Sequence, residues 1–278
     1  MNVLELSVVI FGVAAIAGFL GSLTGLGGGV VLTPALTLLF GVDIRYAIGA
    51  SLVSVIATSS GAASAYVKEG YSNIRIGMFL EVATVFGAIA GAMLASKIPT
   101  SGLGVVLGVV LLISAYLSTR PHPDPSESDR GDPLAERLRL NSNYPTFRGW
   151  QHYRVERVKA GFSVMFGAGV LSGLLGIGSG AFKVIAMDRA MRIPFKVSTT
   201  TSNFMIGVTA AASAGVYLNR GYIDPALAMP VMLGVSAGAL LGARQLAGAQ
   251  TRILRVIFGI VVGVLALEMI WNGLTRRI

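Results

Sequence analysis

The stretch TGLGGGVVLTP, residues 24–34, decides the fold of this chain. Its glycines interrupt an apolar, uncharged run, where lipid would offer no hydrogen bonds to a non-helical backbone. Irregular backbone is tolerated at such a depth only where it is buried in protein or lines a cavity. The stretch GIGSGAFKV, residues 176–184, repeats the pattern. Both stretches predict a break in a membrane helix.

Apolar segments of membrane-spanning length surround these breaks. Of the 278 residues, 54% are hydrophobic and 13% are charged, against roughly a quarter charged in an average soluble domain. The first 23 residues have no basic region before them and no cleavage site, so they predict a permanent segment and not a signal peptide. The apolar segments are residues 6–23, 28–40, 46–67, 74–96, 102–118, 157–174, 179–191, 197–218, 225–247 and 253–271. This pattern predicts an all-α polytopic membrane protein.

The second set of five segments repeats the first. A shift of 151 residues, without a gap, places the glycines of one break on those of the other, Ser51 on Ser202 and Thr58 on Thr209. Such a match indicates duplication. The predicted organisation is membrane repeat 1 at residues 1–118, a polar, water-exposed connector at 119–156 and membrane repeat 2 at 157–278. A short helix is expected at residues 134–140 of the connector.

The two repeats are expected to be inverted. The second segment of each repeat, about 13 residues at ~1.5 Å per residue, is too short to cross the bilayer and pairs with the first segment around the break. Each repeat then has an odd number of crossings. With the connector in the cytoplasm, inverted repeats place sixteen Lys and Arg inside and five outside, as the positive-inside rule favours. Parallel repeats would give thirteen and eight.

The breaks themselves suggest an anion site. Free N–H groups at a helix start, together with the helix dipole, favour an anion. Broken helices at corresponding places in two repeats are typical of transporter binding sites. The alternative is that the glycines only let helices pack closely. Recurrence in both repeats, each time before a short helix, favours the site.

Polar side chains in the apolar segments are further candidates. Lys183 follows the second break by one turn, and its ammonium is expected to point back at that loop; the alternative is that it reaches water at the interface. Hydroxyl and amide groups on the third and eighth segments could replace the hydration of an oxyanion, or could bond neighbouring helices. Glu81 is the candidate for a coupling proton, whereas Glu268 is expected to reach water.

Catalysis is not expected from this chain. It has no cysteine, and His122 and His152 both lie in the connector, so no catalytic set or metal-ligand spacing occurs within the membrane. We therefore expect no enzyme activity, no cofactor and no metal. The net charge of +9 comes from loops and not from one basic face, so nucleic acid is not an expected partner. The sequence indicates no oligomeric state.

The motifs resemble the TauE/SafE sulfite exporter family, also called the toluene sulfonate uptake permease family. The resemblance rests on GLGGGVVLTP at residues 25–34, GASL at 49–52, GIGSGAFKV at 176–184, AMD at 186–188 and TSNFM at 201–205. It covers nearly the whole chain except the connector. Ser179 in place of a glycine, Lys183, and Ile185 where Pro34 would align depart from the commoner pattern.

This resemblance implies transport of sulfite, thiosulfate or a related organosulfur anion across a prokaryotic inner membrane, with protons as the coupling ion. Together with the residues above, it gives a predicted substrate site of Thr24, Gly25, Gly27, Gly28, Gly29, Ser51, Gly176, Gly178, Ser179, Gly180, Lys183, Thr201, Ser202 and Asn203. The expected mechanism is alternating access around a site between the two glycine loops. An anion channel of the same architecture and a membrane scaffold without transport are the competing hypotheses.

Overall fold

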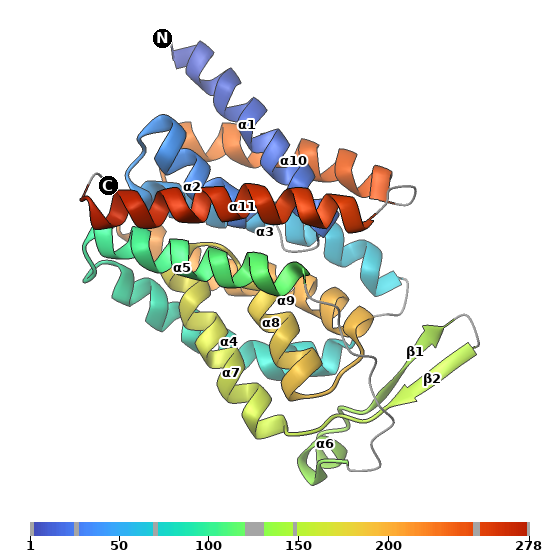
Figure 1. Ribbon diagram of the computed structural model, residues 1–278. Coiled ribbons are helices and arrows are strands. Elements are labelled where there is room, and N and C mark those ends of the chain that lie inside the picture. The colour runs from blue at the N-terminus through green and yellow to red at the C-terminus, as the bar shows by residue number, and fades with distance from the viewer. Residues whose placement is uncertain are drawn as a thin grey trace.

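A computed structural model describes residues 3–24, 28–68, 72–119, 131–146, 149–246 and 251–276. Each of the ten apolar segments is a helix, with ends within a few residues of those expected (Figure 1). The first half contains α1 (Val3–Thr24), α2 (Gly29–Phe40), α3 (Ile44–Lys68), α4 (Ile74–Ala95) and α5 (Thr100–Thr119). The second contains α7 (Val158–Leu175), α8 (Gly180–Ile185) running into the π-helix η1 (Ala186–Ala190), α9 (Phe195–Asn219), α10 (Pro225–Leu246) and α11 (Thr251–Leu274).

Several of these helices have the length and composition of membrane spans. Within the described residues, α1, α4, α7 and α10 are long and apolar enough to cross a membrane. Shorter apolar helical stretches are Gly29–Phe40, Ile44–Ser60, Thr100–Tyr116 and Gly259–Leu274. Apolar side chains such as Phe86, Leu240 and Ile260 lie on the outer surface, as lipid-facing residues do. The fold is that of an all-α, multi-pass membrane protein.

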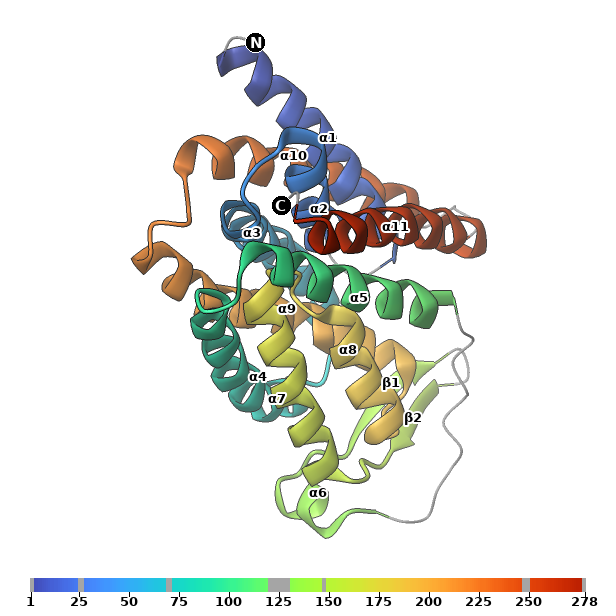
Figure 2. The ribbon, with the colours of Figure 1, turned by 60° about the vertical axis from the view of Figure 1, so that its left-hand side comes forward.

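Helices of one half pack mainly against helices of the other half. The first helix of each half packs on the fourth helix of the other, so α1 lies along α10 and α7 along α4, while α5 lies along α11 (Figure 1, Figure 2). The long helices α3 and α9 pack against each other between these pairs. Each cross-half contact therefore has a counterpart with the halves reversed.

Glycines at matching positions allow these close approaches. A Cβ added to Gly18 of α1 would touch the carbonyl oxygen of Val235, and one added to Gly169 of α7 would touch that of Thr84. Residues 18 and 169, and likewise 84 and 235, are 151 apart. Small residues let membrane helices approach each other in this way. The 151-residue repeat is thus also a repeat of contacts.

Part of the connector is folded. It contains α6 (Pro133–Arg137), in the region where a short helix was expected, and a hairpin of β1 (Ser142–Thr146) and β2 (Gly149–Tyr153), with Ser142 opposite Tyr153. The hairpin projects at one end of the helices (Figure 1).

The connector, expected to be exposed to water, is buried in part. Trp150 is exposed, but Ala135, Leu140 and Val155 are buried in a cluster with side chains of α4, η1 and α9, among them Ile76, Met187 and Val197. The apolar residues between the prolines and charges bury themselves on the helix ends.

Candidate functional site

The second break is visible in full between α7 and α8. Gly176 ends α7 in the left-handed conformation at φ 68°, and its N–H donates to the carbonyl oxygen of Ser172. Gly178 and Ser179 also have positive φ, at 69° and 46°. Glycine adopts this conformation readily, whereas serine does so under strain. The chain therefore reverses sharply before α8 begins at Gly180, as the glycine pattern predicted.

The first break is described from its second half. Gly28 precedes α2, which begins at Gly29. The predicted residues Gly25 and Gly27 lie outside the described residues, and Thr24 ends α1 with its side chain outside them as well.

The two breaks adjoin each other at Ser51 of α3. The Ser51 hydroxyl lies 2.9 Å from the carbonyl oxygen of Gly176 and 3.4 Å from that of Gly29, within donating distance of both. A Cβ added to Gly29 would lie 3.3 Å from the Gly176 oxygen. The start of α2 and the end of α7, separated by well over a hundred residues, are thus in direct contact.

An equivalent bond joins α9 to α8. The Ser202 hydroxyl donates to the carbonyl oxygen of Gly180 at 3.3 Å, just as Ser51 approaches that of Gly29. All four residues correspond under the 151-residue shift. In this conformation both hydroxyls hold the loops in place rather than face an open space.

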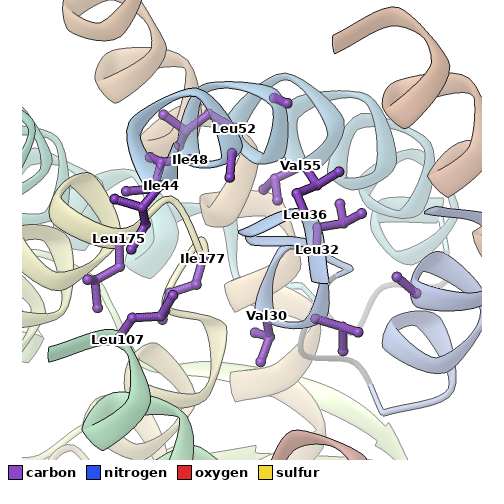
Figure 3. Close-up of a cluster of buried hydrophobic side chains, with 14 of the residues drawn as sticks. Val30, Leu32, Leu36, Ile44, Ile48, Leu52, Val55, Leu107, Leu175 and Ile177 are labelled. Carbon is purple, nitrogen blue, oxygen red and sulfur yellow. The ribbon is translucent and has the colours of Figure 1, made fainter. Parts of the chain in front are cut away.

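Two apolar side chains at corresponding positions press on the breaks. Val55 of α3 is next to Gly29 and Gly178, and Ile206 of α9 is next to Gly178. Figure 3 shows Val55 beside Leu32 and Leu36 of α2, with Ile177 and Leu175 on the other side of the cluster near Ile44 and Ile48. The loops are closely packed in this conformation.

Lys183 is completely buried, and its side chain does not reach the protein surface. The alternative that it extends to water is therefore wrong for this conformation. Its ammonium does not bond to the glycine loop either, but donates to Thr209 Oγ1 of α9 at 2.5 Å. The Thr209 hydroxyl in turn donates to Glu81 Oε1 of α4 at 2.6 Å. Three helices thus contribute to one buried polar cluster, Lys183, Thr209 and Glu81.

Some buried polar atoms of the site have no hydrogen-bond partner among the described residues. They include Glu81 Oε2, Ser179 Oγ and Ser172 Oγ. Unsatisfied buried polar atoms are uncommon in proteins and call for an explanation. Glu268, the other intramembrane carboxylate weighed above, is exposed on α11.

The remaining predicted residues have different surroundings. Thr201 accepts a hydrogen bond from the backbone N–H of Asn73 at 3.0 Å, next to the connector. Asn203 is half-buried. The structure brings Gly28, Gly29, Ser51, Gly176, Gly178, Ser179, Gly180 and Ser202 together around the two breaks. Thr201 instead lies where α9 meets Asn73, the residue before α4 that contacts the connector.

Sequence reasoning gave Thr209 no role. A signal was present, because Thr209 follows Ser202 by seven residues and so lies on the same helix face two turns away. Its partners on α4 and α8 could not be read from that spacing.

Comparison with known proteins identifies the family of this chain. Residues 10–269 match the family model described as Sulfite exporter TauE/SafE. The chain belongs to the TauE/SafE family. Proteins similar to this chain include the probable membrane transporter proteins YunE and YdhB of Bacillus subtilis and MJ0441 of Methanocaldococcus jannaschii.

The match to these relatives extends over most of each chain. Identity to YunE is 28% over 96% of this chain and 98% of the relative, and to YdhB 30% over 85% and 87%. Identity to MJ0441 is 27% over 93% of both chains. No solved structure is significantly similar to this TauE/SafE chain. The family and these relatives make the protein a membrane transporter.

Proposed function

We propose that this TauE/SafE protein is a secondary active transporter that moves a small sulfur-containing oxyanion, such as sulfite, thiosulfate or an organosulfonate, across the inner membrane, coupled to protons. The observation that carries the proposal is the contact of the two helix breaks at Ser51, with the buried Lys183 one turn away. Broken helices at corresponding places in two repeats are typical of transporter binding sites.

The chemistry of these groups suits an oxyanion. Neither α2 nor α8 has a side-chain cap, and the first N–H groups of a helix have no partner within it. Ser179 contributes a buried hydroxyl without a partner among the described residues, and Lys183 contributes positive charge. A tetrahedral or pyramidal oxyanion accepts hydrogen bonds in several directions, which this set of donors could supply.

Inverted repeats are part of the proposal. Arg45, which follows α2, donates to the carbonyl oxygen of Ile98 and lies over the ring of Tyr222. Asn73, at the opposite end of α3 from Arg45, contacts Leu140 of the connector and Thr201. Asn73 and Tyr222 lie in the loops after α3 and after α9, which correspond under the 151-residue shift. One loop lies at the far end of α3 and the other beside Arg45 at its start, which supports inversion of the repeats.

Alternating access would then require the loops to separate from their covering side chains. Val55 and Ile206 occupy corresponding positions over the breaks, so rocking of one repeat against the other would uncover the site first on one side and then on the other. The packed conformation described above corresponds to a closed step of that cycle.

The test is uptake of labelled sulfite, thiosulfate and sulfoacetate into proteoliposomes that contain the full chain. A transporter gives saturable flux that responds to a pH gradient, whereas a channel follows voltage without saturating at low concentration. Lys183→Met is expected to abolish flux and also the thermal stabilisation of purified protein by the anion. The exposed Lys159 provides the matched control, and Lys159→Met should transport normally. Equal flux through both variants would reject the site, and no flux of any of the three anions in the unaltered protein would reject the function.

A further inference from the structure

The buried cluster of Lys183, Thr209 and Glu81 is present in only one half of the molecule. The corresponding residues of the other half are Leu32, Thr58 and Met232. Among the residues that the structure describes, Thr58 donates to backbone oxygens of its own helix, those of Ser54 and Val55. The two halves have equivalent helix packing, yet only one of the two equivalent places holds charged side chains. The charged cluster is therefore not required for packing the helices.

The cluster is balanced in charge as it stands. Lys183 and Glu81 carry opposite charges and are connected through the Thr209 hydroxyl. Within the described residues, Lys183 is the ion that interacts electrostatically with the Glu81 carboxylate. A buried charge without compensation is strongly unfavourable. An anion that bound Lys183 would therefore leave uncompensated negative charge, one unit for a monoanion and two for a dianion such as thiosulfate. Neutralising Glu81 removes one unit in either case.

Other charged groups on the neighbouring elements do not supply this compensation. Lys159 of α7 and Lys196 of α9 are exposed near the helix starts, and so is Arg189 of η1. Asp188 of η1 has Arg189 as its electrostatic partner. The neutralising charge must then come from solution, and a proton bound to the carboxylate supplies it.

We propose that Glu81 takes up a proton when Lys183 binds the substrate anion, so that proton and anion are carried together in the same direction. This inference rests on the function proposed above. The structure also indicates which carboxylate oxygen would accept the proton. Glu81 Oε2, buried and without a partner among the described residues, is the atom to which the proton adds.

Thr209 is the positioning residue of this exchange. Its hydroxyl has one proton to donate and two acceptors in reach, Glu81 Oε1 at 2.6 Å and the carbonyl oxygen of Met205 at 2.9 Å. While Glu81 is ionised, the hydroxyl donates to the carboxylate and accepts from Lys183. After a proton from solution adds to Oε2, the carboxylate charge is lost and the hydroxyl can turn to Met205. Lys183 then has no anionic partner in the cluster and binds the substrate anion. When the anion leaves, Glu81 returns the proton to water and the bonds reform.

The experiment measures proton and anion movement together in proteoliposomes, with labelled sulfite and labelled thiosulfate as probes. Thiosulfate stays ionised near neutral pH, so the protons that move with it belong to the protein. The unaltered protein is expected to move about one more proton per anion than Glu81→Gln, because one carboxylate takes up one proton. Flux through Glu81→Gln should lose its dependence on the pH gradient while exchange of anion for anion continues.

Thr209 gives a second, milder set of variants. Thr209→Val is expected to lower the proton-to-anion ratio, Thr209→Ser to restore it, and Thr58→Val, the equivalent change in the other half, to leave it unaltered. The Thr209 pair decides the question if Glu81→Gln fails to fold. An unchanged ratio in both Glu81→Gln and Thr209→Val, or protons moving opposite to the anion, would overturn the inference while saturable anion flux left the function standing. Absence of flux in the unaltered protein would instead reject the function.

Discussion

Gly238 illustrates how single residues set the distance between helices. It lies where α10 meets α1, and a Cβ at this position would collide with the backbone carbonyl oxygen of Ala15. Backbone cannot move aside as a flexible side chain can, so the helices would have to separate. At the corresponding place in the other pair, Gly87 meets the carbonyl oxygen of Phe166 in the same way.

We expect Gly238→Ala to destabilise the protein by about 1–3 kcal/mol, the usual range for overpacking. Thermal unfolding of the purified protein in detergent would show a lower midpoint. Gly263 in α11 has nothing within 4 Å of an added Cβ, so Gly263→Ala is the matched control and should not lower the midpoint. Equal midpoints for the two variants would contradict the proposed contact.

The positions of the helix breaks could be predicted from the sequence, but the hydrogen bonds of the neighbouring side chains could not. The glycine pattern located Gly29, Gly176 and Gly180, because a break in an apolar run has a local signature. The partner of Lys183 could not be predicted, since the bond between Thr209 and Glu81 joins residues 128 positions apart. That bond depends on which face of α4 turns toward α9, which no local pattern specifies.

At the scale of elements, the connector is joined to the helices by a chain of hydrogen bonds. The Asn73 side chain caps α4 by accepting from the N–H of Ile76, and its amide donates to the carbonyl oxygen of Leu140 and to the Tyr153 hydroxyl. The backbone N–H of Asn73 donates to Thr201 of α9. One residue thus connects the hairpin, α4 and α9.

Burial raises the pKa of Tyr153 from its ordinary value of 10 to about 12, although the bond to Asn73 acts in the opposite direction. A group whose folded-state pKa is raised contributes stability below its unfolded pKa and loses it as the pH rises. The contribution of Tyr153 should therefore be complete below about pH 10 and disappear between about pH 10 and 12.

Tyr153→Phe removes this titration and the bond to Asn73. We expect faster hydrogen exchange of β2 in the variant at neutral pH, and a stability that changes less than that of the unaltered protein between pH 10 and 12. Replacing the exposed Trp150 of the same strand by Phe gives the control. A variant with the same pH dependence as the unaltered protein would show that Tyr153 does not carry it.

The helices were predictable and the hairpin was not, for a physical reason. Each of the ten predicted helices is an apolar run, and its ends can be located where the apolar residues stop. The strand β1 is short, polar and contains Pro145, so its sequence has neither the alternation nor the composition of a strand. Its structure depends on pairing with β2 and on the burial of neighbouring residues against the helices.

For the whole molecule, the central expectation is that corresponding loops face opposite sides of the membrane. The chain contains no cysteine, so single cysteines can report each loop. Asp43→Cys, in the loop before α3, should react with a membrane-impermeant maleimide in intact cells. Lys196→Cys, at the corresponding start of α9, and Trp150→Cys in the hairpin should react only after permeabilisation. Parallel repeats would instead make positions 43 and 196 react together.

The packing of helices from one half on helices of the other also affects how the protein assembles during synthesis. The main partner of α1 is α10, which begins at Pro225, so α1 lacks most of its final contacts until that helix has been translated. Chains are synthesised from the N-terminus at about 5–20 residues per second. For that interval α1 must wait in the lipid or beside the insertion machinery, with its glycine-lined face uncovered. Assembly of this transporter is therefore completed late, when the second half arrives and encloses the first.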